Sequence, residues 1–265
     1  MISKKKKNLI LNFLIFVIFF FISCSKDETQ NDEIKPLKIL KIKGVDASFL
    51  PTLRQSNIAL INRNNQIEDP LLTLKNNGVN TIRLRIWNNA NDANSSISKV
   101  KILAQEIKSL GMKTLICVHY SDTWADPGTQ SKPLAWQNSN FETLKNQVYE
   151  FTKEIMTQIN PEYIQIGNEI NSGLLWQEGH INNLNQMKQL LQEGIKAVRE
   201  SNSNTKIILH FAGIENSNWF FTQVNSLNYD IIGISYYPIW HGKDLNLLAQ
   251  SVKFDWEKLA VKNLF

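Results

Sequence analysis

The sequence predicts an α/β protein whose parallel strands form part of a (β/α)₈ barrel. Segments with strand and helix character alternate six times along the chain. The strand segments are short apolar runs rich in β-branched residues, as expected for parallel strands that are covered on both faces. Polar and aromatic residues follow the end of each strand, which is where (β/α)₈ barrels carry their functional sites.

The expected strands are Ile39–Val45, Asn80–Trp87, Lys113–Tyr120, Tyr163–Gly167, Lys206–Phe211 and Asp230–Tyr236. Between them, Asp69-Pro70 supplies an N-cap and a first-turn proline, and Gly78 ends that helix. Two more helices show apolar residues at spacings of three and four, over Phe141–Ile155 and Leu184–Val198. The stretch over residues 245–265 also has a helical pattern.

A doubly wound sheet is the alternative α/β fold. It usually carries a glycine-rich phosphate turn after its first strand, whereas "GVDASFLPT" follows the first strand here. The six units average about 37 residues, so eight would need roughly 300. We therefore expect about six of the eight β/α units of a barrel in this chain.

The N-terminal residues have the pattern of an export signal. Lys4–Lys7 precede the uncharged apolar run Leu9–Ser23, which is short for a membrane span, and Cys24 follows a small residue. We expect a lipoprotein signal peptide over 1–23, a lipidated Cys24 and flexible tether over 24–37, and the partial barrel over 38–265. An ordinary signal peptide or an anchor helix is the alternative. The expected location is the outer membrane of a Gram-negative bacterium, facing the cell surface.

Charge and cysteine content argue against a nucleic-acid-binding protein and against a fold held by disulfides. Without residues 1–23 the chain has 25 basic and 24 acidic residues, and it contains no basic tract suited to nucleic acid. With Cys24 lipidated, Cys117 has no cysteine partner within the chain. We expect a monomer that relies on its core and touches the membrane only through its lipid.

The segment "QIGNEINSG" places Glu169 where an apolar strand ends. Desolvation there favours a neutral carboxyl, which can protonate a leaving-group oxygen as a general acid. Asn168 could then donate to a sugar hydroxyl. A structural glutamate paired with an arginine is the alternative reading.

Other candidates surround this position. Arg83 and Arg85 alternate on one strand face and could point into the barrel toward carboxylates. Loop 117–136 and the segment after residue 235 are rich in tryptophan and tyrosine, which stack on sugar rings. His119 and His210 follow strands and could converge, although the spacing of the four histidines favours hydrogen bonding over a metal site.

Five stretches, "GVDASFL", "TIRLRIWN", "HYSDTWADPGTQSKPLAW", "IGNEINSGLLWQEG" and "IGISYYPIWHG", resemble glycoside hydrolase family 53, the endo-β-1,4-galactanases. The resemblance implies a retaining (β/α)₈ enzyme that cuts galactan side chains of pectin. It implies that Glu169 is the acid/base, that Asn168 is its neighbour in the site, and that Arg83 or Arg85 sits beside the nucleophile. It further implies a substrate groove lined by Asp46, His119, Trp124, Asp126, Trp136, Tyr236, Trp240 and His241. The resemblance implies no cofactor. Some bacterial members of the family bind calcium in their last loops, and we do not expect those loops in this chain.

The family's nucleophile is a second glutamate at the end of the seventh strand. After Trp240 the acidic residues are Asp244, Asp255 and Glu257, and none of them is expected to end a strand. We therefore expect a lipid-anchored endo-β-1,4-galactanase for galactan or arabinogalactan, represented here by a truncated chain that lacks hydrolytic activity. The alternatives are a non-catalytic glycan-binding lipoprotein and a related barrel glycanase that acts on mannan or xylan.

Overall fold

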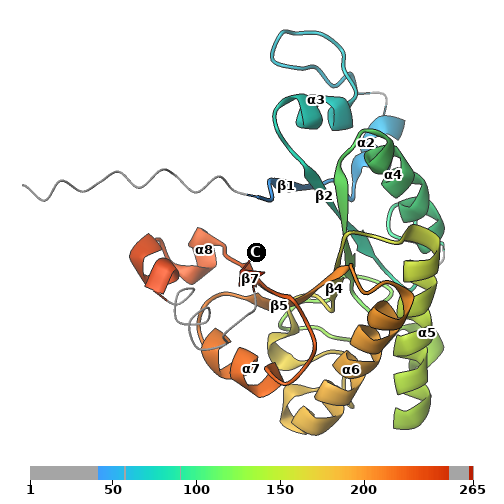
Figure 1. The fold of residues 1–265 in the computed structure, drawn as a ribbon, viewed down its shortest axis with the longest axis vertical. Helices are drawn as coiled ribbons and strands as arrows, with labels where there is room; N and C mark the ends of the chain where they lie inside the picture. Colours follow the sequence, from blue (N-terminus) through green and yellow to red (C-terminus); the bar gives the residue numbers. More distant parts are fainter. Residues whose placement is uncertain (1–40, 57, 90, 251–262, 265) are drawn as a thin grey trace, which may run out of the picture. The chain divides into compact units, whose positions relative to one another are not determined.

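The computed structural model describes residues 41–56, 58–89, 91–250 and 263–264 (Figure 1). The predicted signal peptide, the lipidation site Cys24 and the tether lie outside the described residues. Among the helices described, none is both long enough and apolar enough to cross a membrane.

One parallel sheet organises the described residues, and its strands lie side by side in the order of the sequence. The strands are β1 (Gly44–Asp46), β2 (Thr81–Ile86), β3 (Lys113–Val118), β4 (Tyr163–Ile166), β5 (Lys206–Ala212), β6 (Ile231–Ser235) and β7 (Asn263–Leu264). Figure 1 shows that this sheet curls, with helices along its outer side. Strands β1 to β6 form a curled half-barrel, as predicted from the alternating pattern.

Helices and short 3₁₀ turns connect the strands. The helices are α2 (Leu50–Gln55), α3 (Pro70–Asn76), α4 (Ile97–Ser109), α5 (Phe141–Ile159), α6 (Leu184–Ser201), α7 (Ser217–Val224) and α8 (Pro238–His241). The 3₁₀ turns are η1 (Leu134–Trp136), η2 (Ile170–Ser172) and η3 (Ile181–Asn183). In α3 the predicted N-cap is present, because the Asp69 carboxylate accepts from Leu71 N–H at 2.9 Å.

Two predicted elements differ from the structure. The first strand covers only Gly44–Asp46, so Asp46 is its last residue and does not follow it. Residues 245–250 are helical as expected, but Asn263–Leu264 form strand β7, so the helical prediction is wrong there. The pairing of these two residues with Ile231 and Ile232 is a long-range contact, which a local sequence pattern cannot show.

The pleat of the strands separates two apolar regions. Side chains such as Ile82, Ile116 and Ile164 point outward and pack with the helices in the main core. Alternate positions point inward, and Leu115, Tyr163, Ile208 and Ile231 form a smaller cluster inside the curl. One step further along the strands the inward positions become polar, with Cys117, Gln165 and His210. The sequence thus closes the interior at one end and leaves chemistry-bearing side chains at the other.

Helix α6 approaches the sheet closely at Gly194. A Cβ added there would lie 2.9 Å from Tyr120 Oη and 3.0 Å from Ile166 Cγ2. Tyr120 is fully buried, and its hydroxyl is 2.6 Å from the Thr152 hydroxyl, so it has little freedom to move. Because Gly194 has no side chain, α6 can pack this close to β4, and a larger residue would push the two apart.

Gly194→Ala tests this close approach. Helix propensity alone predicts a gain of about 1 kcal/mol in the free energy of unfolding. Overpacking of the buried site costs roughly 1–3 kcal/mol, so we expect a net loss measured by urea denaturation. Gln192→Ala, on the exposed face of the same helix, is the matched control and should change stability by less than about 0.5 kcal/mol. A stabilised Gly194→Ala variant would show that α6 is not held by this contact.

Candidate active site

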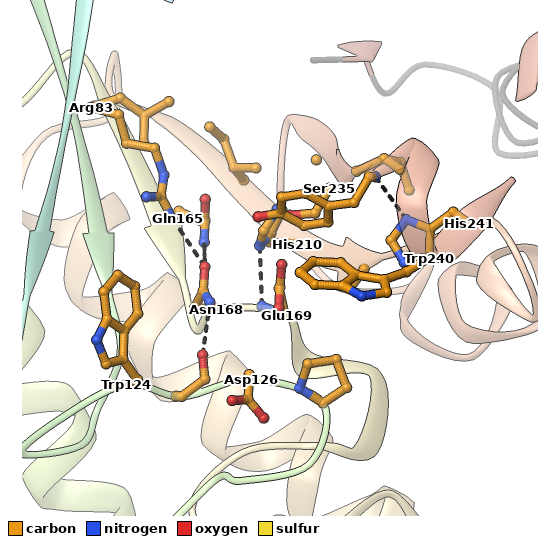
Figure 2. Close-up of a pocket in the computed structure, with 18 residues that line it drawn as sticks. Arg83, Trp124, Asp126, Gln165, Asn168, Glu169, His210, Ser235, Trp240 and His241 are labelled. Carbon is orange, nitrogen blue, oxygen red and sulfur yellow. Dashed lines mark hydrogen bonds between the residues drawn. The ribbon is translucent and has the colours of Figure 1, made fainter. Parts of the chain in front are cut away.

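A cavity of about 730 Å³ opens at the C-terminal ends of strands β2 to β6 (Figure 2). Its walls come from these strand ends and from the loops that follow them. The lining residues include Arg83, Trp124, Asp126, Gln165, Asn168, Glu169, His210, Ser235, Tyr237, Trp240 and His241.

Glu169 reaches the cavity through an unusual backbone path after β4. Gly167 has φ of +80°, and a Cβ there would lie 2.5 Å from Ile170 Cγ2, so glycine is required for this turn. Glu169 itself has φ of 47°, and its N–H donates to His210 Nδ1 at 3.1 Å. The half-buried carboxyl group has no hydrogen-bond or ion-pair partner among the described residues. It is therefore available to a ligand.

Asn168 is the centre of a hydrogen-bond network beside Glu169. Its Oδ1 accepts from Arg83 Nη2 at 3.0 Å and from Gln165 Nε2 at 3.1 Å. Its Nδ2 donates to the Ala125 carbonyl at 2.8 Å, in the loop after β3 (Figure 2). One Nδ2 hydrogen is used in this way and the second can reach a ligand. The network fixes one side chain to β2, β4 and the β3 loop together.

Arg83 connects the network to β1. Its Nη1 pairs with the Asp46 carboxylate at 2.5 Å, so the carboxylate predicted for a buried arginine is present. Its Nη2 also lies 3.0 Å from Cys117 Sγ. Burial raises the pKa of the Cys117 thiol to about 11, with Arg83 partly opposing the rise, so the sulfur stays neutral at pH 7.

Arg85 is two residues further along β2, is less exposed to solvent than Arg83 and takes different partners. Its Nε donates to Ser95 Oγ at 3.0 Å, and its guanidinium carbon lies 4.1, 4.8 and 4.4 Å from the ring centroids of Phe49, Trp87 and Trp124. Cation–π contacts of this kind stabilise a guanidinium that has lost its water. Arg85 therefore supports the indole of Trp124 from behind.

Two histidines hold backbone positions in the site while remaining neutral. His119 Nδ1 accepts from Ala125 N–H at 3.0 Å, and His210 Nε2 lies 2.9 Å from Ser235 Oγ. Burial, together with the positive charge of Arg83, lowers the pKa of each from its usual 6.5 to about 3. Since each Nδ1 is an acceptor, each neutral ring carries its proton on Nε2.

Tryptophan side chains flank the carboxyl group. Trp124 is 48 % exposed and Trp240 is 73 % exposed. Figure 2 shows them on opposite sides of the Asn168–Glu169 pair. Beside Trp240, His241 is held by Tyr237 N–H, which donates to its Nδ1 at 2.9 Å. Open indole faces around an unpaired carboxyl suit a ring-shaped neutral ligand such as a sugar.

The structure brings together eight of the residues singled out in the sequence. The residues that line the cavity are Arg83, Trp124, Asp126, Asn168, Glu169, His210, Trp240 and His241. Asp46, Arg85 and His119 do not line the cavity, but each contacts a residue that does: Asp46 pairs with Arg83, Arg85 packs on Trp124, and His119 accepts from Ala125 N–H. Trp136 is 7 % exposed and packs on Phe151, away from the cavity. The Tyr236 hydroxyl donates to the Gly242 carbonyl at 2.6 Å and so fixes the end of α8.

Sequence reasoning missed Gln165 and Ser235. Both sit inside apolar strands, where a polar residue at an inward position needs a partner. That signal was visible for Gln165, which is the one amide in "YIQIG". Within the described part of the chain, no group of three or more His, Cys, Asp or Glu side chains is arranged to hold a metal ion.

The fold and the site together define an incomplete barrel of the (β/α)₈ class, with its cavity at the C-terminal ends of the strands. The model of glycosyl hydrolase family 53 matches residues 42–262, and the chain belongs to this family. It is 37 % identical over 226 residues to an endo-β-1,4-galactanase of Bacillus subtilis, covering 78 % of this chain and 52 % of that protein. It is 33 % identical over 220 residues to arabinogalactan endo-β-1,4-galactanase A of Aspergillus niger, covering 77 % and 63 %.

A solved structure is also similar to this chain. The GH53 catalytic domain of Ignisphaera aggregans superposes with a TM-score of 0.79 and 37 % identity, over 84 % of this chain and 66 % of that one. The chain thus spans about half to two thirds of the length of these relatives.

The buried neutral histidines predict a specific loss of stability in acid. The pKa of His210 is about 3 in the folded chain and 6.5 in its ordinary state, so folding favours the neutral ring. The stabilisation that folding gains by holding this ring neutral is complete above pH 6.5. As the pH drops toward 3, the free energy of unfolding falls by up to about 1.4 kcal/mol per pH unit. We expect His210→Asn to be less stable than the unaltered chain at pH 7.5, with the gap narrowing by pH 4.5 in thermal unfolding.

Ser235→Ala is the control for this experiment. It removes the hydrogen bond to Nε2 but keeps the titrating ring, so its stability should run parallel to that of the unaltered chain across the pH range. A constant gap for His210→Asn from pH 7.5 to 4.5 would contradict the neutral, buried state of this histidine.

Proposed function

We propose that this cavity binds β-1,4-galactan, either alone or as part of arabinogalactan. We also propose that Glu169 occupies the position of the proton donor, which would protonate the glycosidic oxygen when a second carboxylate completes the site. Membership of family 53 and the names of the galactanase relatives support the substrate class. The observation that carries the residue assignment is the free carboxyl of Glu169 between two exposed indoles, on a backbone held by His210.

The binding part of the proposal rests on complementary surfaces. The indole faces of Trp124 and Trp240 would stack on the apolar faces of galactose rings. The second Nδ2 hydrogen of Asn168 is free to donate to a sugar hydroxyl next to the scissile bond. Gln165, Arg83 and the Ala125 carbonyl already fix the orientation of this amide, so little freedom is lost on binding.

The chemical part requires a second carboxyl group. In a retaining mechanism the acid protonates the leaving oxygen while a carboxylate about 5–5.5 Å away attacks the anomeric carbon and forms a glycosyl–enzyme bond. Water then attacks that carbon, and the first residue, now a base, takes its proton. Glu169 can fill the first role in both steps.

Among the described residues, the other carboxylates near the site have different partners. Asp46 pairs with Arg83, and Asp126 Oδ1 accepts from Gly128 N–H at 2.8 Å. The described residues of β7 pair with Ile231 and Ile232, at the end of β6 opposite to the site. We therefore propose that the 265-residue polypeptide binds galactan but does not hydrolyse it.

Affinity electrophoresis and product analysis test this function. We expect the purified chain to be retarded in gels that contain β-1,4-galactan and to release no galacto-oligosaccharides above a buffer control. Trp124→Ala should weaken binding by about tenfold, because a stacking platform of this size contributes on the order of 1–2 kcal/mol. Ile102→Ala, at an exposed position on the outer helix α4, is the matched control and should bind like the unaltered chain.

Two outcomes would contradict the proposal in different ways. Steady release of galacto-oligosaccharides would show that a carboxylate outside this account completes the mechanism. Unchanged mobility in galactan gels, with a normal unfolding transition, would remove galactan as the ligand of this cavity.

We also propose attachment to the outer membrane through a lipid on Cys24. The basic and apolar segments before this cysteine support the assignment. The chain expressed in a Gram-negative host should incorporate labelled palmitate and fractionate with membranes, whereas Cys24→Ser should incorporate none. Equal labelling of both forms would contradict lipidation at this cysteine.

A further inference from the structure

Gln130 is a buried glutamine that contacts the backbone on both sides of the Glu169 Cα. It is 1 % exposed, and it is not among the residues that line the cavity. It lies in the loop after β3. Its Nε2 donates to the carbonyl group of Asn168 at 2.8 Å and to that of Glu169 at 3.2 Å. Gln130 therefore reaches the candidate proton donor only through main-chain atoms.

A tight turn brings this glutamine into position. Asp126 and Thr129 exchange two backbone hydrogen bonds, of 2.9 and 3.1 Å. The Nε2 of Gln130 also donates to the Asp126 carbonyl at 3.0 Å, so the side chain folds back across the turn. The main-chain carbonyl of Gln130 accepts from Trp176 N–H at 2.8 Å, which fixes it to the loop after β4. The amide is thus held at its base as well as at its tip.

The two peptide units that flank the Glu169 Cα are both held by side chains. The preceding unit is held at each end, because the Asn168 carbonyl accepts from Gln130 and the Glu169 N–H donates to His210 Nδ1 at 3.1 Å (Figure 2). The following unit is held at its carbonyl, which also accepts from Gln130. Since peptide units are planar, their orientations set φ and ψ of Glu169 and so the direction of its Cβ.

Glu169 needs this support because its backbone lies in the left-handed region, with φ of 47° and ψ of 54°. Gly167 and Gly173 nearby have φ of +80° and +96°, which glycine adopts without strain. A residue with a side chain is disfavoured there and stays only where surrounding contacts hold it. The side-chain contacts that hold the Glu169 backbone are those of Gln130 and His210.

The amide of Gln130 acts here as a donor alone. Its Oε1 is buried and has no hydrogen-bond partner among the described residues. Its Nε2 has two hydrogens for three carbonyl acceptors, so one hydrogen is shared. Turning the amide over would place an oxygen against three carbonyl oxygens. Because an unsatisfied buried acceptor is unfavourable, packing alone does not explain an amide at this position.

We propose that Gln130 is a positioning residue for Glu169, which together with His210 holds the two flanking peptide units and so directs the carboxyl group into the cavity. It acts through the backbone and does not contact the ligand. The link to binding rests on the proposed place of Glu169 at the glycosidic oxygen. Loss of the Gln130 donor releases both carbonyl groups and lets the Glu169 backbone leave the left-handed region.

Amide hydrogen exchange followed by NMR on the full chain tests this inference without a ligand. Gln130→Met keeps a side chain of similar length and removes the donor, so we expect the Glu169 N–H to exchange about tenfold faster. Lys132→Met is the matched control, because the Lys132 ammonium joins the same two loops through Glu178 at 2.9 Å and bonds to neither flanking peptide unit. Gln137→Met alters an exposed glutamine of the same segment. Neither control should change the Glu169 rate.

Two results of this experiment would overturn the inference. The first is an unchanged Glu169 rate in Gln130→Met. The second is an equal acceleration in Lys132→Met, which is what a role in joining the loops would produce. Thermal unfolding of each variant establishes that its fold is intact.

The unaltered chain provides a measurement that depends on no variant. The side-chain amide hydrogens of Gln130 should exchange about tenfold more slowly than those of the exposed Gln137, because main-chain carbonyl groups hold them. Equal exchange of the two side-chain amides would overturn the inference even if Gln130→Met failed to fold.

A double-mutant cycle with galactan connects the positioning to binding. We expect Glu169→Ala and Gln130→Met each to weaken galactan binding by about tenfold, and the double variant to bind no more weakly than Glu169→Ala alone. Lys132→Met should bind like the unaltered chain. Additive losses in the double variant, or normal affinity in Gln130→Met, would overturn the inference, because Gln130 would then not act through the carboxyl group.

Failure of the proposed function can be told apart from failure of this inference. If the unaltered chain does not bind galactan, or if Glu169→Ala binds it as tightly, the proposed function is wrong. The exchange experiments contain no galactan, so they still decide whether Gln130 fixes the backbone of Glu169.

Discussion

The site depends on one side chain, the amide of Asn168. It accepts from Arg83 on β2 and Gln165 on β4, and it donates to Ala125 in the loop after β3. Each partner belongs to a different part of the chain, so this one residue sets the relative positions of three strand ends. Glu169 follows directly, and its direction is determined by the same backbone. The candidate proton donor is thus placed by a buried polar network, in which each loss of a partner leaves a desolvated group behind.

The network is arranged around positive and neutral groups. Arg83 supplies the charge, with Asp46 as its counter-ion, while Cys117, His119 and His210 stay uncharged because burial opposes their ionised forms. Neutral histidines can accept from backbone N–H groups, and those contacts support the backbone at Ala125 and Glu169. The charge of Arg83 and the burial of the imidazoles act in the same direction, because each disfavours a second positive charge in the interior.

Much of this arrangement could be predicted from the sequence. Alternation of apolar strands and amphipathic helices indicated the parallel sheet, and the polar residues at strand ends indicated the face that carries the site. The sequence indicates Arg83 because a charge on a buried strand needs a carboxylate partner, and it indicates Asn168 because this residue directly precedes Glu169. Local patterns could not show which aromatic side chains are buried and which face the cavity. Trp136 and Trp124 share one loop, yet one is buried against Phe151 and the other is open to the cavity. Strand β7 was also missed, since its identity depends on pairing with β6.

We propose that the cavity around Asn168 and Glu169 is where the chain holds galactan. Hydrogen exchange of the full chain, with and without β-1,4-galacto-oligosaccharides, tests it most directly, because it maps protection along the backbone. The account predicts slower exchange in the segments that carry Trp124, Glu169 and Trp240 and unchanged exchange in the outer helix α4. Protection confined to other segments, or the same exchange with and without the sugar, would contradict it.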